Sequence, residues 1–182
     1  MSASRPRPPW LLVIDIQHVF TEPGSGWYAE GAAATVSAIE RLLPHFAGRT
    51  VLTRFVRDPL EAGAWSSYYD AWSEFRIPPD HPRWELSLAA PAGAPVIDEP
   101  TFSKWTDRLV DVVGDADLVL CGVATECCVL STAFAAADAG RSVTVVADAC
   151  AGASTAAHEA ALALMQANAP LISVTTLADL IG

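Results

Sequence analysis

Short runs of apolar residues alternate along the chain with longer segments of helical periodicity. Six such runs predict strands, most of them buried on both faces of a sheet, at residues 10–15, 50–55, 95–99, 117–123, 142–149 and 171–176. Helical patterns occupy 32–46, 125–140 and 154–169, and a short helix follows the last strand. This alternation predicts an α/β, doubly wound fold: a Rossmann-like three-layer sandwich with a mainly parallel six-stranded sheet.

Length and composition limit the broad class of the protein. A chain of 182 residues, 52% of them hydrophobic, is sufficient for one domain with a proper core, and we expect a single domain over 1–182. The formal charge of -10 has no compensating basic cluster, so nucleic acid and anionic membrane surfaces are poor partners. No apolar run reaches the ~20 residues that span a bilayer, and the opening segment lacks a secretory signal pattern. We therefore expect a cytoplasmic protein.

Residues 57–95 interrupt the alternation with many prolines and aromatic residues. This segment is too aromatic for a flexible linker, and we interpret it as a packed excursion. Two roles remain open from the sequence: a cover over a site or a contact with another subunit, or a structural loop that wraps the core.

The four cysteines are better read as reduced thiols than as disulfides. They lie at Cys121, Cys127, Cys128 and Cys150, in a chain that is large enough to do without covalent links. No histidine stands within a few residues of a cysteine and no C-x-x-C pair occurs, so we expect no metal site.

Two segments stand where ligands bind in such sheets, beyond the carboxyl ends of the strands. Asp15 ends the first strand, and the turn Gly122–Cys128 follows the fourth. We predict that Thr125 caps the next helix, which places Cys128 in its first turn, where backbone N–H groups and the helix dipole favour a thiolate and can bind an oxyanion. Glycine-rich nucleotide motifs are absent from the sequence, which disfavours nucleotide chemistry.

A nucleophilic cysteine requires a base and a group that manages its charge. Asp15 can accept the thiol proton, and Lys104, after the third strand, can stabilise the thiolate. Taken alone, each residue also has an ordinary interpretation: Asp15 as a turn cap, Lys104 as a surface lysine and Cys128 as a small buried hydrophobe.

Three segments, in order, resemble the isochorismatase-like hydrolases. They are LLVIDIQHVF, PTFSKWTDRL and CGVATECCVLSTAFAAADAGRSVTVVADACA, and the likeness extends from about residue 10 to 175. The resemblance implies Cys128 as nucleophile, Asp15 as general base and Lys104 as supporting cation. It also implies a cis peptide between Val123 and Ala124, with the amides of Ala124 and Cys128 forming an oxyanion hole.

The resemblance further implies a cysteine hydrolase that cleaves a C–N bond of a small carboxamide or N-carbamoyl (ureido) compound through a Cys128 thioester, without a cofactor. Phe20, Trp65 and Trp105 are candidates for the substrate pocket or, equally, for the core. The apolar composition and the resemblance lead us to expect a homodimer or homotetramer. Two alternatives are a non-catalytic ligand-binding or thiol redox-sensing protein and a vinyl-ether hydrolase of the isochorismatase type.

One departure from the family pattern concerns metal binding. Nicotinamidases of this superfamily carry T-x-D-x-H after the second strand, whereas this chain has TRFVR, with Phe55 and Arg57 in place of the acid and the histidine. A metal-assisted nicotinamidase is therefore in doubt. Arg54 and Arg57 either bind a carboxylate of the substrate or are surface charges, and the sequence leaves both readings open.

Overall fold

The computed structural model describes residues 7–182, so the first part of the opening segment, where we find no secretory signal, lies outside the described residues. Six parallel strands form one sheet in the order β3-β2-β1-β4-β5-β6. The strands are β1 (Trp10–Ile14), β2 (Thr50–Phe55), β3 (Val96–Glu99), β4 (Leu118–Val123), β5 (Val143–Ala151) and β6 (Ile172–Thr175). The predicted α/β class and parallel sheet are confirmed.

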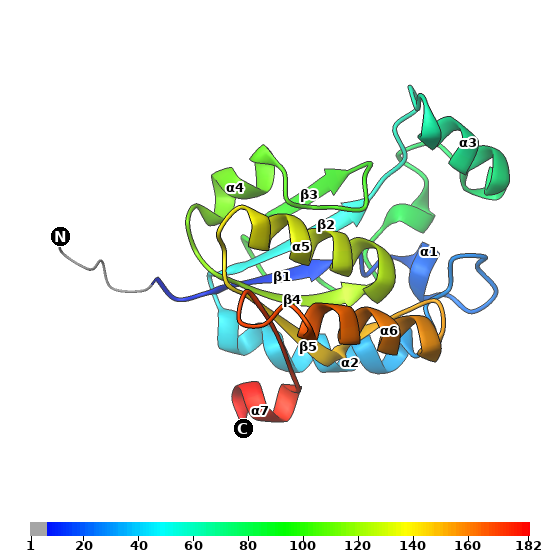
Figure 1. The fold of residues 1–182 in the computed structure, drawn as a ribbon. Helices are drawn as coiled ribbons and strands as arrows, with labels where there is room; N and C mark the ends of the chain where they lie inside the picture. Colours follow the sequence, from blue (N-terminus) through cyan, green and yellow to red (C-terminus); the bar gives the residue numbers. More distant parts are fainter. Residues whose placement is uncertain (1–6) are drawn as a thin grey trace.

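Helices cover both faces of this sheet (Figure 1). One face packs against α2 (Ala32–Leu42) and α7 (Leu177–Ile181), and the other against α4 (Asp107–Val113), α5 (Leu130–Asp138) and α6 (Thr155–Gln166). Because β1 and β4 are buried on both faces, their side chains are apolar throughout, whereas β2, although mostly buried, also carries Thr50, Thr53 and Arg54.

Two predicted helices are interrupted in the structure. The segment 32–46 is an α-helix only to Leu42 and then tightens into the 3-10 turn η1 (Leu43–Phe46), where Pro44 lacks the N–H that an α-helix would use. The segment 125–140 opens with η4 (Thr125–Val129), a π-helical turn, before α5 begins. Gly140 follows α5 with a φ of 82°, as expected for a glycine after a helix end.

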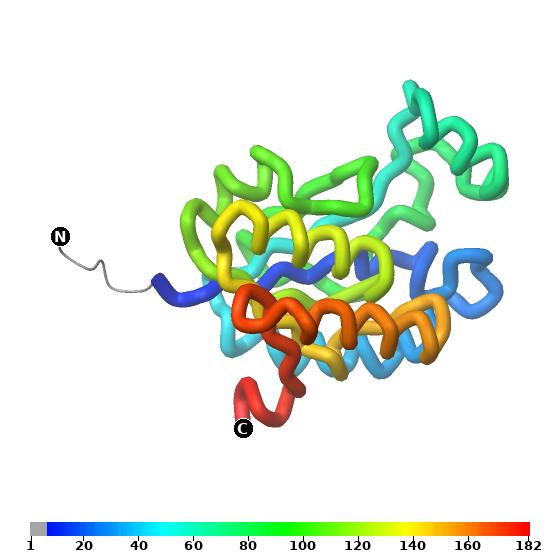
Figure 2. Tube along the Cα trace, in the orientation of Figure 1, coloured from blue at the N-terminus to red at the C-terminus, as the bar shows by residue number. Residues whose placement is uncertain are grey.

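The excursion 57–95 is folded; its first part lies beyond the carboxyl ends of the strands, on the same edge as the loop after α1 (His18–Thr21), as the tube in Figure 2 shows, and its last residues return to the amino edge, where β3 begins. It contains α3 (Ala64–Ala71) and two 3-10 turns, η2 (Ser73–Phe75) and η3 (Pro82–Trp84). Tyr69, Phe75 and Trp84 are fully buried. These three aromatic side chains therefore pack into the core. The segment that carries them also lies next to the predicted site.

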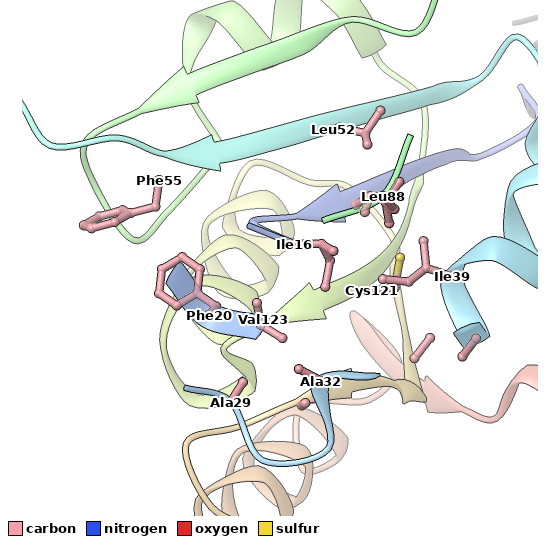
Figure 3. Packing of buried hydrophobic residues seen from close by; sticks show 14 of the residues in the cluster. Ile16, Phe20, Ala29, Ala32, Ile39, Leu52, Phe55, Leu88, Cys121 and Val123 are labelled. Atoms are coloured by element: carbon pink, nitrogen blue, oxygen red, sulfur yellow. The ribbon is translucent and has the colours of Figure 1, made fainter. Parts of the chain in front are cut away.

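The core extends to that edge without a break (Figure 3). Leu52 and Cys121 lie within the sheet, whereas Phe20 and Phe55 lie at the strand ends, with ring centroids 6.4 Å apart. Among the described residues, no helix is both long enough and apolar enough to cross a membrane.

Candidate active site

The site begins at the centre of the sheet, between β1 and β4, where the strand order reverses. Gly122 holds these strands unusually close: with a φ of 118°, a Cβ at this position would lie 2.0 Å from the carbonyl oxygen of Ile14. Only glycine is compatible with that approach. The close contact places Asp15, directly after β1, beside the turn that follows β4.

Asp15 is fully buried and has a left-handed backbone, with a φ of 51° that is uncommon for a non-glycine residue, although aspartate adopts it more readily than most. Thr53 of β2 holds it, because its hydroxyl donates to Oδ1 of Asp15 over 2.7 Å and its carbonyl accepts the Asp15 amide over 3.2 Å. These two hydrogen bonds fix the orientation of the carboxylate. Its other oxygen, Oδ2, lies beside Lys104.

Lys104 is also fully buried, in the loop between β3 and α4. Its Nζ lies 3.0 Å from Oδ2 of Asp15, donates to the carbonyl of Thr101 over 2.8 Å and lies 4.9 Å from the centroid of the Phe55 ring. A buried cation requires such compensation. No donor in residues 7–182 has hydrogen-bond geometry toward Oδ2 of Asp15, so this oxygen keeps a free lone pair despite the ion pair.

Cys128 lies in the π-helical turn η4 and is 3% exposed. The turn differs from our expectation, because Ala124 and not Thr125 is the residue before the helix, and the Thr125 hydroxyl instead bonds Nδ1 of His158 over 2.8 Å. The peptide bond between Val123 and Ala124 is cis. Ala124 and Cys128, whose amides we expect to form the oxyanion hole, both line the same cavity.

The surroundings of Cys128 oppose the thiolate that its place at the start of a helix favours. Burial raises the pKa of this thiol well above its usual range, and the negative charge of Asp15 raises it further, whereas Lys104 opposes both effects. Burial raises the pKa of the thiol more than the start of a helix lowers it, because the thiol is almost completely removed from water. The surroundings of Cys128 therefore favour the neutral thiol over the thiolate.

A cavity of about 170 Å³ opens at Cys128. Half of its lining residues are aromatic, and these come from four parts of the chain: the α1 region, the end of β2, the excursion and the loop after β3. The turn that follows β4 and the loop after β5 supply most of the others. The lining residues are Phe20, Gly26, Trp27, Phe55, Tyr68, Trp72, Phe102, Ala124, Glu126, Cys127, Cys128 and Ala153.

The structure divides the three aromatic candidates. Phe20 lines the cavity, whereas Trp65 lies behind the lining, with its ring centroid 5.1 Å from that of Phe102. Trp105 is partly buried against the half of the core that α4, α5 and α6 cover. Trp27, Tyr68, Trp72 and Phe102 line the cavity without having been predicted. Their aromatic character was the only available signal, since their convergence depends on how the excursion packs.

Arg54, in β2, and Arg57, just after it, are not among the residues that line this cavity. Arg54 binds Asp98 through two hydrogen bonds of 2.7 and 2.8 Å, and Arg57 pairs with Glu61. Both charges are therefore compensated within the chain, and the side chains of Arg54 and Arg57 are only 22% and 15% exposed. Phe55, at the position of the family's acid, is part of the cavity wall. Among the described residues, no group of three acidic, histidine or cysteine side chains is arranged to hold a metal ion.

The other cysteines occupy different surroundings. Cys121 and Cys150 are buried in the two halves of the core, as expected for packing residues. Cys127 lines the cavity instead, and burial together with the charge of Glu126 raises its pKa to about 11. The cavity thus contains two thiols, of which Cys128 alone has its pKa shifted by both Asp15 and Lys104.

Comparison with known proteins supports the reading of the fold. The structure is similar to a cysteine hydrolase from Pseudomonas syringae pv. phaseolicola 1448A (25% identity, TM-score 0.82, covering 100% of this chain and 97% of that one). It is also similar to an isochorismatase family protein from Desulfovibrio vulgaris subsp. vulgaris str. Hildenborough (27% identity, TM-score 0.79, covering 93% and 94%). A zinc complex of the pyrazinamidase of Pyrococcus horikoshii shares the fold (23% identity, TM-score 0.75, covering 92% and 98%).

No curated protein matches the sequence. The family model described as Isochorismatase domain matches residues 9–177, which is nearly the whole chain. The buried Asp15, Lys104 and Cys128 and the cavity beside them all lie within these residues, and the protein belongs to the isochorismatase family of hydrolases.

Proposed function

We propose that this protein hydrolyses a C–N bond of a small carboxamide or N-carbamoyl compound through a thioester on Cys128. The observation that carries the proposal is the buried ion pair of Asp15 and Lys104, placed beside a thiol that opens onto an apolar cavity. Solved relatives whose names are cysteine hydrolase and pyrazinamidase support the same chemistry.

Acylation starts from the neutral thiol. Asp15 accepts the proton of Cys128 on its free Oδ2 lone pair while the sulfur attacks the carbonyl carbon, so that charge develops on the carbonyl oxygen and not on an isolated thiolate. The amides of Ala124 and Cys128 are our candidates for binding that oxygen. Asp15 then gives the proton to the amide nitrogen, the C–N bond breaks, and ammonia or an amine leaves.

Deacylation uses the same groups in reverse. Water attacks the thioester carbonyl and Asp15 accepts one of its protons; the C–S bond then breaks and the proton returns to the sulfur of Cys128. The product is a carboxylic acid, or a carbamic acid when the substrate is an N-carbamoyl compound. Lys104 acts on the base through its 3.0 Å contact with Asp15 and requires no proton transfer of its own.

Release of ammonia from a panel of small primary amides and ureido compounds tests this proposal. The wild-type protein should hydrolyse at least one of them, and Cys128→Ala should lower kcat by about 1000-fold or more while the fold is retained. Cys127→Ala is the matched control, because it removes the neighbouring thiol of the same cavity and should keep most of the activity. Undiminished hydrolysis by Cys128→Ala would contradict the proposal.

A further inference from the structure

Phe55 belongs to two surroundings at once, the wall of the cavity and the neighbourhood of Lys104. Its side chain is almost fully buried and lines the cavity, and the centroid of its ring lies 4.9 Å from Nζ of Lys104. Lys104 itself is not among the lining residues. One ring of the cavity wall is therefore packed against the buried cation of the candidate site.

Lys104 has few polar partners for a fully buried cation. A charged lysine has three N–H donors, and among the described residues its Nζ donates one hydrogen bond, to the carbonyl of Thr101 over 2.8 Å. Asp15 contributes the ion pair at 3.0 Å, without hydrogen-bond geometry toward its Oδ2. Because a buried charge is costly unless it is compensated, a further source of attraction is expected at this nitrogen.

The face of an aromatic ring supplies such an attraction without a net charge of its own. The ring quadrupole attracts a cation that lies within about 6 Å of the centroid, and it does so more strongly when both groups are removed from water. A carboxylate at position 55, as in the nicotinamidases of the superfamily, would compete with Asp15 for Lys104. A phenyl ring attracts the cation and leaves Asp15 as its anionic partner.

The packing around Phe55 fixes the ring in this place. The Phe55 amide donates to Oε1 of Gln17 over 2.7 Å, and Nε2 of Gln17 donates to the Phe55 carbonyl over 3.2 Å. The centroid of the Phe55 ring lies 5.8 Å from that of Phe102 and 5.9 Å from that of Trp27. The ring is thus held against Lys104 before any substrate binds, which is the condition for a preorganised electrostatic contact.

We propose that Phe55 is a positioning residue, which holds the Lys104 cation beside Asp15 through the face of its ring. The part of this inference that concerns catalysis rests on the function proposed above. Phe55 acts through Lys104 and requires no contact with the reacting atoms. Its attraction for a cation depends on the electron density of the ring, whereas its role in the cavity wall depends on shape, so an experiment can separate the two.

Fluorination of the ring tests this inference, because fluorine withdraws electrons from the face of a ring and changes its shape little. Phe55 is replaced by phenylalanines that carry one, two or three fluorine atoms, and the midpoint of urea unfolding is measured at pH 7. We expect the midpoint to fall with each fluorine, by about 0.5 M in the trifluorinated protein.

The same series at Phe134 is the matched control. This residue packs against the core from α5, and none of the described cations lies over its ring. Its fluorination should not lower the midpoint. In the Lys104→Met background, the steps of the Phe55 series should disappear, because the cation has been removed. For the identified substrate, kcat should also fall stepwise, by about threefold or more with three fluorines on Phe55, and should stay constant in the Phe134 series.

A urea midpoint that stays constant or rises across the Phe55 series would overturn the inference. Steps that persist in Lys104→Met would do the same, since the fluorines would then act through packing. A falling midpoint with unchanged kcat would exclude the positioning role. Failure of the proposed hydrolysis would look different, because no amide would release ammonia although the midpoint still fell with each fluorine on Phe55.

Discussion

At the level of single residues, the neutral state of Cys128 leads to a prediction about its reactivity. Because burial and Asp15 raise its pKa, alkylation of the wild-type protein by iodoacetamide should be slow at pH 7 and rise continuously beyond pH 8.5, the ordinary value for a free cysteine. The rate should be measured against pH for the wild type and for Cys128→Ala, whose difference isolates this thiol from Cys127.

If the alkylation rate of Cys128 had already reached its maximum at about pH 7, this assignment would be contradicted, since the resting protein would then hold a stable thiolate. A proposed substrate analogue that fills the cavity should slow the reaction at every pH. The experiment therefore also separates a base-assisted thiol from the redox-sensing alternative, which requires a thiolate that is already formed.

The residues of the candidate site were predictable to different degrees. Asp15, Lys104 and Cys128 could be placed from the sequence because each follows a strand, and parallel strands end at one edge of the sheet. The pocket wall was not predictable in the same way. Trp27 and Tyr68 reach the cavity through packing between segments that are about forty residues apart, and no local pattern encodes such contacts.

At the level of elements, one hydroxyl joins the two segments that carry the candidate chemistry. Oγ1 of Thr132 on α5 accepts the amide of Lys104 over 2.9 Å and donates to the carbonyl of Cys128 over 2.6 Å. Thr132 is fully buried and touches neither the cavity nor the reacting atoms that we propose. We therefore treat it as a positioning residue.

Thr132→Val keeps the shape of this side chain but leaves the Lys104 amide without its acceptor. We expect a loss of about 1–3 kcal/mol in the free energy of unfolding, measured with urea. For the identified substrate, kcat should fall by about tenfold, since small displacements of reacting groups slow catalysis. Thr132→Ser should restore kcat, and Ser131→Ala, on the neighbouring half-buried position, should change neither quantity. Loss of stability with full kcat would reduce Thr132 to a purely structural role.

The strands and the longer helices were predictable, whereas two of the short helices were not. The strands agree with their apolar runs to within one or two residues, because a strand buried on both faces has a continuous apolar pattern. The eight residues of α3 and the seven of α4 were missed, since such short helices carry little periodicity. The π-helical turn at Cys128 was also missed, because an apolar helical pattern does not distinguish it from an ordinary first turn.

At the level of the whole molecule, three buried thiols tie stability to pH. Burial raises the pKa of Cys121 and Cys128 well above the usual range and that of Cys150 to about 12, whereas in the unfolded chain each thiol titrates near 8.5. Above pH ~8.5 the unfolded chain loses these protons and the folded protein keeps them. Their contribution to stability is therefore complete below that pH and decreases as the pH rises toward the folded pKa values.

The free energy of unfolding should consequently fall between pH 8.5 and 9.5, by up to about 1.4 kcal/mol per pH unit for each thiol. Urea unfolding in the presence of a reductant, at half-unit steps of pH, measures this slope. Cys121→Ala should make the slope shallower even though its cavity lowers stability at every pH, because it removes one titrating group from the unfolded chain. A stability that stays constant over this interval would mean that the thiols of the folded protein titrate as they do in the unfolded chain, and that the desolvation on which the neutral resting Cys128 depends is absent.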